Sequence, residues 1–321
     1  MLRFKFLATI FAFAAIFGSV PTPTFASDCM ELASVAAIVE PGQAPGIREA
    51  GNGELKPGIN HFTFDGWAGK PIPAFVFVPS GVDVKKAPIM FMMHGAKRGA
   101  VRYLKEWVPH AEKKGVVIIA PKFSKKHFKY SRQYQAGNVF GSKSKGSKYK
   151  PEEQWTFSTI EPLFDEVVKR LDSTTKDYTL YGHSAGSQFA HRFLFYKPDA
   201  RAKRIIAANA GWYTMPWPKA AFPYGLKNAK MPKGSFKKAL AKDVYVILGD
   251  QDNDAKHESL RKTPEANRQG AHRFARGVNF FREGKKQAKR MKIKFGWKVV
   301  VVKGVAHSNG EIAAVAIKFV E

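Results

Sequence analysis

The sequence contains a single cysteine, Cys29, among its 321 residues. One thiol cannot form an internal disulfide, so a small fold held together by disulfide bridges is excluded. Hydrophobic residues make up 45% of the chain, which is enough for a conventional core. A chain of this length is expected to form one large domain or two of average size.

Acidic residues are also scarce, with 26 Asp and Glu against 53 Lys and Arg. Without residues 1–26, the formal net charge is +25. A charge of this size attracts polyanions and anionic surfaces in a salt-dependent way. Because the basic residues are scattered and no nucleic-acid-binding motif accompanies them, we predict no specific nucleic-acid partner. The pattern favours a protein that is simply basic and soluble, with electrostatic association with anionic surfaces as the alternative.

Long hydrophobic runs are confined to the amino-terminal segment. Residues 6–20 are apolar, follow Arg3 and Lys5, and precede two prolines and a small-residue site that ends at Ala26. This run is too short to span a bilayer comfortably, and no later run reaches about 18 apolar residues. The pattern is typical of a cleavable signal peptide over residues 1–26, with an uncleaved anchor as the alternative. We therefore predict a secreted or periplasmic protein.

Strands and helices alternate along most of the remaining chain. Residues 61–64 and 72–78 predict an antiparallel hairpin. Buried strands are expected at residues 88–93, 116–120, 177–181, 204–210, 244–248 and 299–302, and helices at 31–39, 100–114, 155–171, 187–196, 268–289 and 310–320. This alternation predicts an α/β fold with a mostly parallel central sheet and helices on both faces.

Two segments do not follow this alternation. Residues 122–150 are basic, aromatic and rich in glycine and serine, which predicts a long surface loop beside the loop ends of the sheet. Residues 212–242 contain several prolines, aromatic residues and lysines, which predicts a lid-like insert over a site.

The stretch Gly182-His183-Ser184-Ala185-Gly186 matches the pattern G-x-S-x-G and lies between a predicted strand and a predicted helix. A strand that feeds a helix through so tight a turn exposes the serine hydroxyl. Glycine suits positions 182 and 186 because a side chain there would collide with the neighbouring strand and helix. Ser184 is therefore the predicted nucleophile.

A serine hydroxyl needs a general base within hydrogen-bond reach. In a sheet of this kind the acid follows the serine along the chain, and the histidine follows the acid. His307 comes directly after the last predicted strand, whereas His257 lies in a polar loop and His272 in a predicted helix. We therefore predict that His307 is the base.

The acid is expected among Asp250, Asp252 and Asp254, which follow the strand at residues 244–248. The spacing from the strand end favours Asp252 and leaves the other two as alternatives. The same spacing resembles a calcium loop, but Ala255 stands where such a loop requires glycine. We therefore expect no metal ion and no organic cofactor.

A tetrahedral intermediate needs two hydrogen-bond donors for its oxyanion. One should be the backbone N–H of Ala185, and the other should come from Ala96 or Lys97, with Ala96 preferred. His94 is expected to brace that loop, and His183 is expected to point away from the reaction.

These motifs resemble those of the α/β-hydrolase family over residues 60–321. The resemblance rests on Phe91-Met92-Met93-His94-Gly95, Gly182-His183-Ser184-Ala185-Gly186, Gly249-Asp250-Gln251-Asp252 and Gly304-Val305-Ala306-His307. The patterns His94-Gly95-x-x-Arg98 and Gly211-Trp212-Tyr213 resemble the branch of secreted esterases and polyhydroxybutyrate-depolymerase-like enzymes.

The resemblance implies a single α/β-hydrolase domain over residues 27–321 and a serine hydrolase that cleaves small or polymeric carboxylic esters through an acyl-enzyme. Trp212, Tyr213 and Trp217, together with Phe222, are candidate pocket residues. Two alternatives remain open, a peptidase or amidase with the same three catalytic residues, and a non-catalytic protein that binds an anionic polymer or envelope surface.

Overall fold

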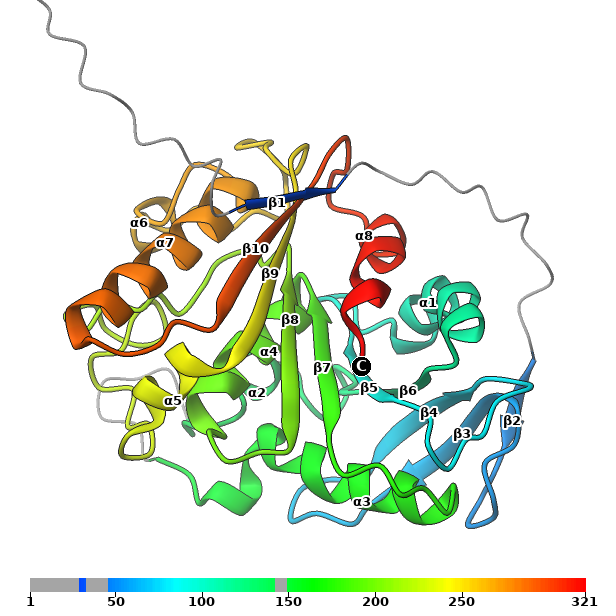
Figure 1. Ribbon diagram of the computed structural model, residues 1–321. Coiled ribbons are helices and arrows are strands. Elements are labelled where there is room, and N and C mark those ends of the chain that lie inside the picture. Colours follow the sequence, from blue (N-terminus) through cyan, green and yellow to red (C-terminus); the bar gives the residue numbers. More distant parts are fainter. Residues whose placement is uncertain (1–28, 33–45, 142–148) are drawn as a thin grey trace, which may run out of the picture.

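The computed structural model describes residues 29–32, 46–141 and 149–321. The predicted signal peptide, residues 1–26, lies outside the described residues. In the described part, one sheet of ten strands has the order β1-β10-β9-β8-β7-β5-β6-β4-β3-β2 (Figure 1). The strands are β1 (Cys29–Leu32), β2 (Ile47–Glu49), β3 (Gly58–Phe64), β4 (Ile72–Val78), β5 (Ile89–Met93), β6 (Val117–Pro121), β7 (Tyr178–His183), β8 (Ala202–Ala208), β9 (Asp243–Gly249) and β10 (Trp297–Val302).

The sheet is mostly parallel, as predicted. All neighbouring strands from β1 to β6 in this order are parallel, whereas β4 is antiparallel to both β6 and β3. The predicted hairpin is therefore the pair β3 and β4. Because β5, β7, β8, β9 and β10 run in one direction, the loops that follow them meet at the same edge of the sheet.

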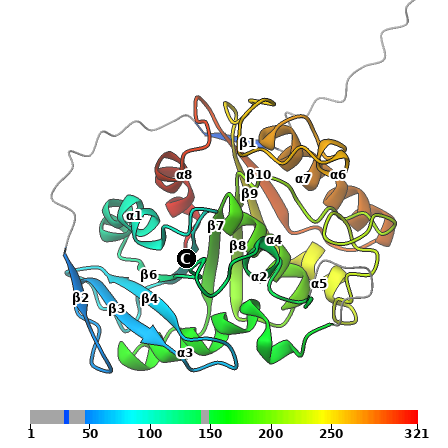
Figure 2. The same ribbon diagram turned by 180° about the vertical axis from the view of Figure 1, so that it is seen from behind.

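Helices cover both faces of the sheet (Figures 1 and 2). Side chains alternate along β5, where Phe91 packs into one core layer and Met90 and Met92 into the other. Helices α1 (Ala100–Lys114) and α8 (Asn309–Ala316) pack on the second layer. On the first layer lie α3 (Ile160–Arg170), α4 (Ala185–Tyr196), α5 (Ser235–Ala241) and α7 (Arg273–Met291). The shorter helices are α2 (Ser131–Tyr134), α6 (Pro264–Asn267) and the 3-10 turns η2 (Glu152–Gln154), η3 (Thr156–Thr159) and η4 (Ile317–Phe319).

Two helix predictions are wrong in part. The helix expected at residues 31–39 is replaced at Glu31 and Leu32 by β1, because the open edge of β10 offers backbone partners for a parallel strand; residues 33–39 lie outside the described ranges. The helix expected from residue 268 begins instead at Arg273, since Gly270 has a φ of 146° that a helix cannot accommodate. Within the described ranges no helix is long and apolar enough to cross a membrane.

The basic segment 122–150 is only partly a surface loop. Phe123, Tyr134 and Val139 are fully buried, so its apolar side chains belong to the core. Arg98 holds the segment in place by donating hydrogen bonds to the carbonyl oxygens of Phe123 (3.2 Å) and Phe128 (3.1 Å). The prediction of a surface loop was wrong here because aromatic residues in a basic stretch can pack inward. Residues 142–148, its lowest-complexity part, lie outside the described residues.

Candidate active site

Ser184 lies at a sharp turn between β7 and α4. Its φ of 57° and ψ of −114° are rare for a residue with a side chain. The turn is so tight that a Cβ on Gly182 would lie 2.1 Å from the carbonyl oxygen of Gly186. A Cβ on Gly186 would lie 1.9 Å from the carbonyl oxygen of Met93 in β5. Only glycine fits at either position, and the turn places Ser184 on the wall of a pocket.

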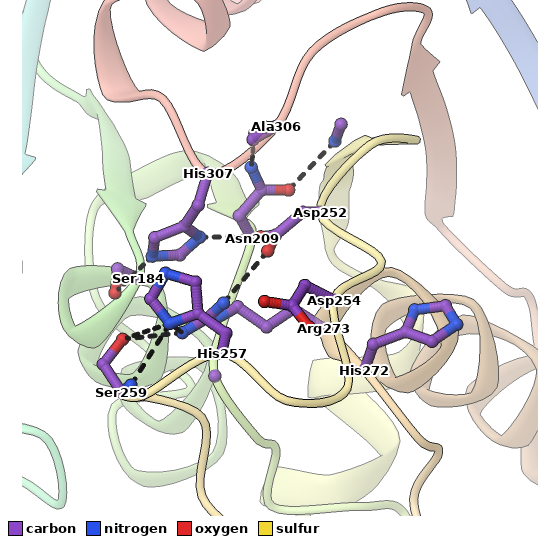
Figure 3. Close-up of polar contacts among 12 residues, drawn as sticks. Ser184, Asn209, Asp252, Asp254, His257, Ser259, His272, Arg273, Ala306 and His307 are labelled. Carbon is purple, nitrogen blue, oxygen red and sulfur yellow. Dashed lines mark hydrogen bonds and ion pairs between the residues drawn. The ribbon is translucent and has the colours of Figure 1, made fainter.

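The structure brings Ser184, His307 and Asp252 together from the carboxyl ends of three strands (Figure 3). His307 Nε2 lies 3.0 Å from Ser184 Oγ, and His307 Nδ1 lies 2.6 Å from Asp252 Oδ2. When Nδ1–H donates to the carboxylate, Nε2 is left as an acceptor for the serine hydroxyl. The arrangement can therefore take a proton from Ser184 and hold it on an oriented imidazole.

The other two aspartates have different partners. Asp250 Oδ1 accepts a hydrogen bond from the backbone N–H of Gly304 at 2.8 Å. Asp254 Oδ1 accepts one from the backbone N–H of Lys256 at 2.7 Å on the exposed side of the loop. Neither of these two aspartates forms a hydrogen bond with His307. Asp252 does, and it is only 4% exposed.

The alternative histidines also lie elsewhere. His257 Nδ1 is bonded to Ser259, and its ring centroid is 6.4 Å from that of His307. His272 was predicted to lie inside a helix. In the structure it is the N-cap residue of α7, and its side chain accepts a hydrogen bond from the N–H of Ala275. Figure 3 shows no contact of either side chain with Ser184.

Arg273, at the start of α7, holds the far side of the Asp252 carboxylate (Figure 3). Its Nη1 donates to Asp252 Oδ1 at 3.1 Å, and its Nη2 donates to Ser259 Oγ at 2.8 Å. Both side chains of the Arg273–Asp252 pair are 3% exposed. Sequence reasoning missed Arg273 because a helix-initial arginine carries no local sign of a partner 21 residues upstream.

Asn209 was also missed. It follows β8, has a left-handed φ of 45°, and joins two of the loops at the site. Its Oδ1 accepts from the N–H of Gly249 at 3.0 Å, and its Nδ2 donates to the carbonyl oxygen of Ala306 at 3.2 Å. Asn209 therefore fixes the end of β9 relative to the residue before His307 (Figure 3). The available signal was an asparagine directly after a buried strand.

The two residues predicted to supply the oxyanion donors line the same cavity as Ser184. Ala185 is the first residue of α4, so its N–H has no intrahelical acceptor. Ala96 lies in a turn closed by the hydrogen bond from Arg98 N–H to the carbonyl oxygen of Gly95. Both Ala96 and Ala185 line the pocket, whereas Lys97 does not. His94 braces this loop, as expected, because its Nε2 accepts from the N–H of Phe123 at 3.1 Å.

His183 does not simply point away from the site. Its ring centroid lies 4.6 Å from that of His307, and its Nδ1 is 3.0 Å from the hydroxyl oxygen of Tyr103. Burial, with a smaller contribution from His307, lowers the pKa of His183 well below its ordinary value. His183 is thus a neutral side chain that packs against the ring of His307. Within the described residues it forms no hydrogen bond with the Ser184 hydroxyl.

The cavity beside Ser184 has a volume of about 530 Å³. Its lining contains three cations and several neutral polar groups. The lining residues are Ala96, Ser131, Gln135, Ser184, Ala185, Gln188, Gly211, Trp212, Ser259, Arg261, Lys262, Thr263 and Arg273. No Asp or Glu of the described chain is among them.

Of the candidate pocket aromatics, only Trp212 lines this cavity. Tyr213 is fully buried and stacks on Phe280, with ring centroids 4.5 Å apart. Trp217 packs against the core, and Phe222 contacts the ring of Tyr196. The expectation for Tyr213 and Trp217 does not match their positions, because neighbouring residues of a non-helical segment turn their side chains to different sides.

A second buried arginine lies beneath the cavity. Arg192, in α4, is fully buried and stacks on Trp212 with its guanidinium carbon 4.2 Å from the ring centroid. It donates to Thr214 Oγ1 and to the carbonyl oxygens of Gln135 and Gln188, but forms no ion pair within the described ranges. Burial lowers the pKa of Arg192 to about 9, so it stays protonated at neutral pH.

No group of three His, Cys, Asp or Glu side chains in the described part of the chain is arranged to hold a metal ion. The hydrogen-bonded side chains of Ser184, His307 and Asp252 meet the cavity at Ser184, and Ala96 and Ala185 are among its lining residues.

Comparisons with known proteins identify relatives among solved structures. No family model and no curated protein matches the chain. Poly(aspartic acid) hydrolase-1 from Sphingomonas sp. KT-1 is 41% identical, with a TM-score of 0.79 over 83% of this chain and 99% of its own. LpqC, a poly(3-hydroxybutyrate) depolymerase from Bordetella parapertussis, is 28% identical, with a TM-score of 0.76 over 82% of this chain and 90% of its own. The fold is shared by an S-formylglutathione hydrolase from Agrobacterium tumefaciens. That protein is 15% identical, with a TM-score of 0.51 over 82% of this chain and 91% of its own.

Proposed function

The chain belongs to the α/β-hydrolase family, in its depolymerase-like branch, and is a hydrolase; we propose that it cleaves carboxylic esters through an acyl-enzyme formed on Ser184. The observation that carries this proposal is the hydrogen-bonded line from Ser184 through His307 to Asp252. Ser184 lines a cavity large enough for a small substrate, together with Ala185 and Ala96, the residues that we propose supply the oxyanion donors.

The proposed reaction begins when Ser184 Oγ attacks the ester carbonyl carbon and His307 Nε2 takes the hydroxyl proton. The N–H groups of Ala185 and Ala96 donate to the oxyanion of the tetrahedral intermediate. The intermediate collapses as His307 returns the proton to the leaving alkoxide, and the acyl group remains on Ser184. A water molecule then attacks the acyl-enzyme with His307 as base, which releases the carboxylic acid and restores the serine.

Asp252 and Arg273 serve this reaction without touching the substrate carbonyl. Asp252 fixes the Nδ1–H tautomer of His307 and stabilises the imidazolium that forms. Arg273 holds the other carboxylate oxygen, so that Asp252 keeps its orientation when His307 becomes charged.

The test is hydrolysis of p-nitrophenyl esters from acetate to palmitate by the wild-type protein, Ser184→Ala and Ser187→Ala. Ser187 is a buried serine in the first turn of α4, three residues after Ser184, and has no described contact with His307, so it is the matched control. We expect turnover by the wild-type and Ser187→Ala proteins and a loss of at least about 10³-fold in Ser184→Ala. Equal rates in wild-type and Ser184→Ala would refute the nucleophile assignment.

A second candidate is hydrolysis of amide bonds in an anionic polymer by the same residues. It is favoured by the 41% identity to a poly(aspartic acid) hydrolase, by the net charge of +25 outside residues 1–26, and by a cavity lined with cations. Incubation with poly(aspartic acid), followed by size-exclusion chromatography, distinguishes the two candidates. Shortened polymer without ester turnover would favour the amide reaction, and intact polymer with ester turnover would exclude it.

We also propose that the protein is exported. The support is the basic and then apolar pattern of residues 1–26. The protein recovered from the periplasm or medium should begin at Ser27. A cytoplasmic chain that begins at Met1 would contradict export.

A further inference from the structure

Arg261 lies on the wall of the same cavity as Ser184. Its Nε donates to the hydroxyl oxygen of Tyr224 at 2.7 Å. Its guanidinium carbon lies 5.5 Å from the ring centroid of Trp212 and 5.8 Å from that of Tyr224. These contacts restrain the guanidinium group of an otherwise flexible side chain, so that less conformational entropy is lost when it binds a ligand.

The backbone at this position is held as well. The carbonyl oxygen of Arg261 accepts a hydrogen bond from Arg276 Nη2 at 2.9 Å. Arg276 is fully buried and also donates to the carbonyl oxygen of Gly211, the residue before Trp212. Arg276 therefore ties the backbone of Arg261 to the backbone directly before Trp212.

The terminal nitrogens of Arg261 remain available. Among residues 29–32, 46–141 and 149–321, neither Nη1 nor Nη2 of Arg261 has a hydrogen-bond partner, and no carboxylate forms an ion pair with it. Arg261 thus lines the cavity and has two terminal guanidinium nitrogens that form no hydrogen bond with the described residues. A guanidinium has the fork geometry that binds a carboxylate in a bidentate manner.

The charged residues around the cavity also favour an anionic ligand. Lys262 lines the cavity next to Arg261, and Arg192 lies on the ring of Trp212 beneath it. In the described part of the chain, Arg273 alone among the cavity's arginines has a carboxylate partner, and that partner, Asp252, is not one of the lining residues. Because the cavity lining contributes no negative charge, its positive field favours an anionic group in the substrate.

We infer that Arg261 binds a carboxylate of the substrate and so determines specificity at this site. Lys262, whose Nζ donates a hydrogen bond to the carbonyl oxygen of Lys256 at 3.1 Å, is a second cation of the cavity lining. The inference rests on the proposed function, since it concerns a substrate whose scissile bond lies at Ser184. The substrate class is then an ester or amide that carries a free carboxylate within reach of the reacting carbonyl.

The experiment compares two esters of similar size, neutral p-nitrophenyl butyrate and anionic mono-p-nitrophenyl succinate. For each protein we take the ratio of kcat/KM for the anionic ester to that for the neutral ester. Arg261→Met should lower this ratio by roughly 10- to 100-fold, the loss expected for one charge-assisted pair. Arg261→Lys, which keeps the charge but loses the fork, should lower the ratio less.

The matched control is Lys237→Met, which removes one exposed cation from α5, outside the cavity lining. It changes the net charge by the same amount and should leave the ratio unaltered. An unchanged ratio in Arg261→Met, or an equal fall in Lys237→Met, would overturn the inference, because the effect would then be absent or due to net charge alone.

A binding measurement separates this inference from the proposed function. Titration calorimetry of succinate into Ser184→Ala, and into Ser184→Ala with Arg261→Met, requires no turnover. We expect binding to the first protein and at least tenfold weaker binding to the second. If the wild-type protein hydrolyses neither ester, the ester proposal fails, and this titration still decides the role of Arg261. Equal affinities of the two proteins for succinate would overturn the inference that Arg261 binds a carboxylate.

Discussion

The buried pair of Arg273 and Asp252 should contribute measurably to stability. Replacing Arg273 by Met removes one charge-assisted hydrogen bond to Asp252 and a second hydrogen bond to Ser259. It also leaves a carboxylate that is 3% exposed with the hydrogen bond from His307 as its remaining side-chain partner. We expect the free energy of unfolding to fall by about 3–5 kcal/mol, the range measured when one member of a buried pair is removed.

A double-mutant cycle with Asp252→Asn isolates the pair from other effects of the substitution. With the carboxylate already neutral, removal of Arg273 should cost less, and we expect a coupling energy of about 2–3 kcal/mol. The assay is urea unfolding followed by tryptophan fluorescence and circular dichroism. It does not depend on activity, which Asp252→Asn is expected to reduce.

The control is Lys86→Met, which removes an ion pair with Asp83 whose side chains are 81% and 56% exposed. An exposed pair of this kind should change the free energy of unfolding by less than about 0.5 kcal/mol. A coupling energy below about 0.5 kcal/mol for Arg273 and Asp252 would refute the reasoning, because the carboxylate would then be stabilised by other groups.

Two further predictions concern the turn at Ser184 and the buried side chain of His94. Gly186→Ala places a Cβ 1.9 Å from the carbonyl oxygen of Met93, so we expect a lower midpoint of thermal unfolding and loss of ester turnover. The control is Gly310→Ala, whose Cβ would meet nothing closer than 3.8 Å and which should behave as wild type. Equal midpoints for the two variants would contradict the steric argument. Burial lowers the pKa of His94 from 6.5 to about 3. Below pH 6.5 the unfolded chain therefore binds a proton that the folded protein excludes, and stability falls by up to about 1.4 kcal/mol per pH unit. In urea titrations, His94→Gln should show a shallower loss of stability between pH 6.5 and 3, and an identical slope would argue against a neutral buried His94.

Much of the fold could be predicted because local pattern and tertiary environment agree. The apolar run at residues 88–93 is a strand buried on both faces, and the helix predicted at 100–114 has those bounds in the structure. The elbow is equally local, since Gly182 and Gly186 are required by contacts within and next to the turn itself.

The remaining errors have long-range causes. β1 forms because β10 presents an open edge, which no property of residues 29–32 reveals. Phe123 and Tyr134 pack inward although their segment is basic, because Arg98 binds the backbone carbonyl of Phe123 and stacks on the ring of Tyr134. Secondary structure prediction from single residues has no access to either contact.

The candidate site shows the same division. Ser184, Asp252 and His307 could be selected because each follows a predicted strand, and parallel strands end at one edge of the sheet. Arg273 and Arg261 were not selected, since their roles depend on contacts between α7, the loop after β9 and the segment after β8 that carries Tyr224. The direction of a side chain, as for Tyr213, also depends on packing that the sequence does not display.

Detection of the acyl-enzyme tests the role of Ser184 most directly. The protein is mixed with excess p-nitrophenyl acetate, quenched in acid within the first turnovers, digested and analysed by mass spectrometry. We predict one acetyl group on the peptide that contains Ser184, and none on the same peptide of Ser184→Ala. Acetylation of another residue, with Ser184 unmodified while p-nitrophenol is released, would show that the nucleophile lies elsewhere.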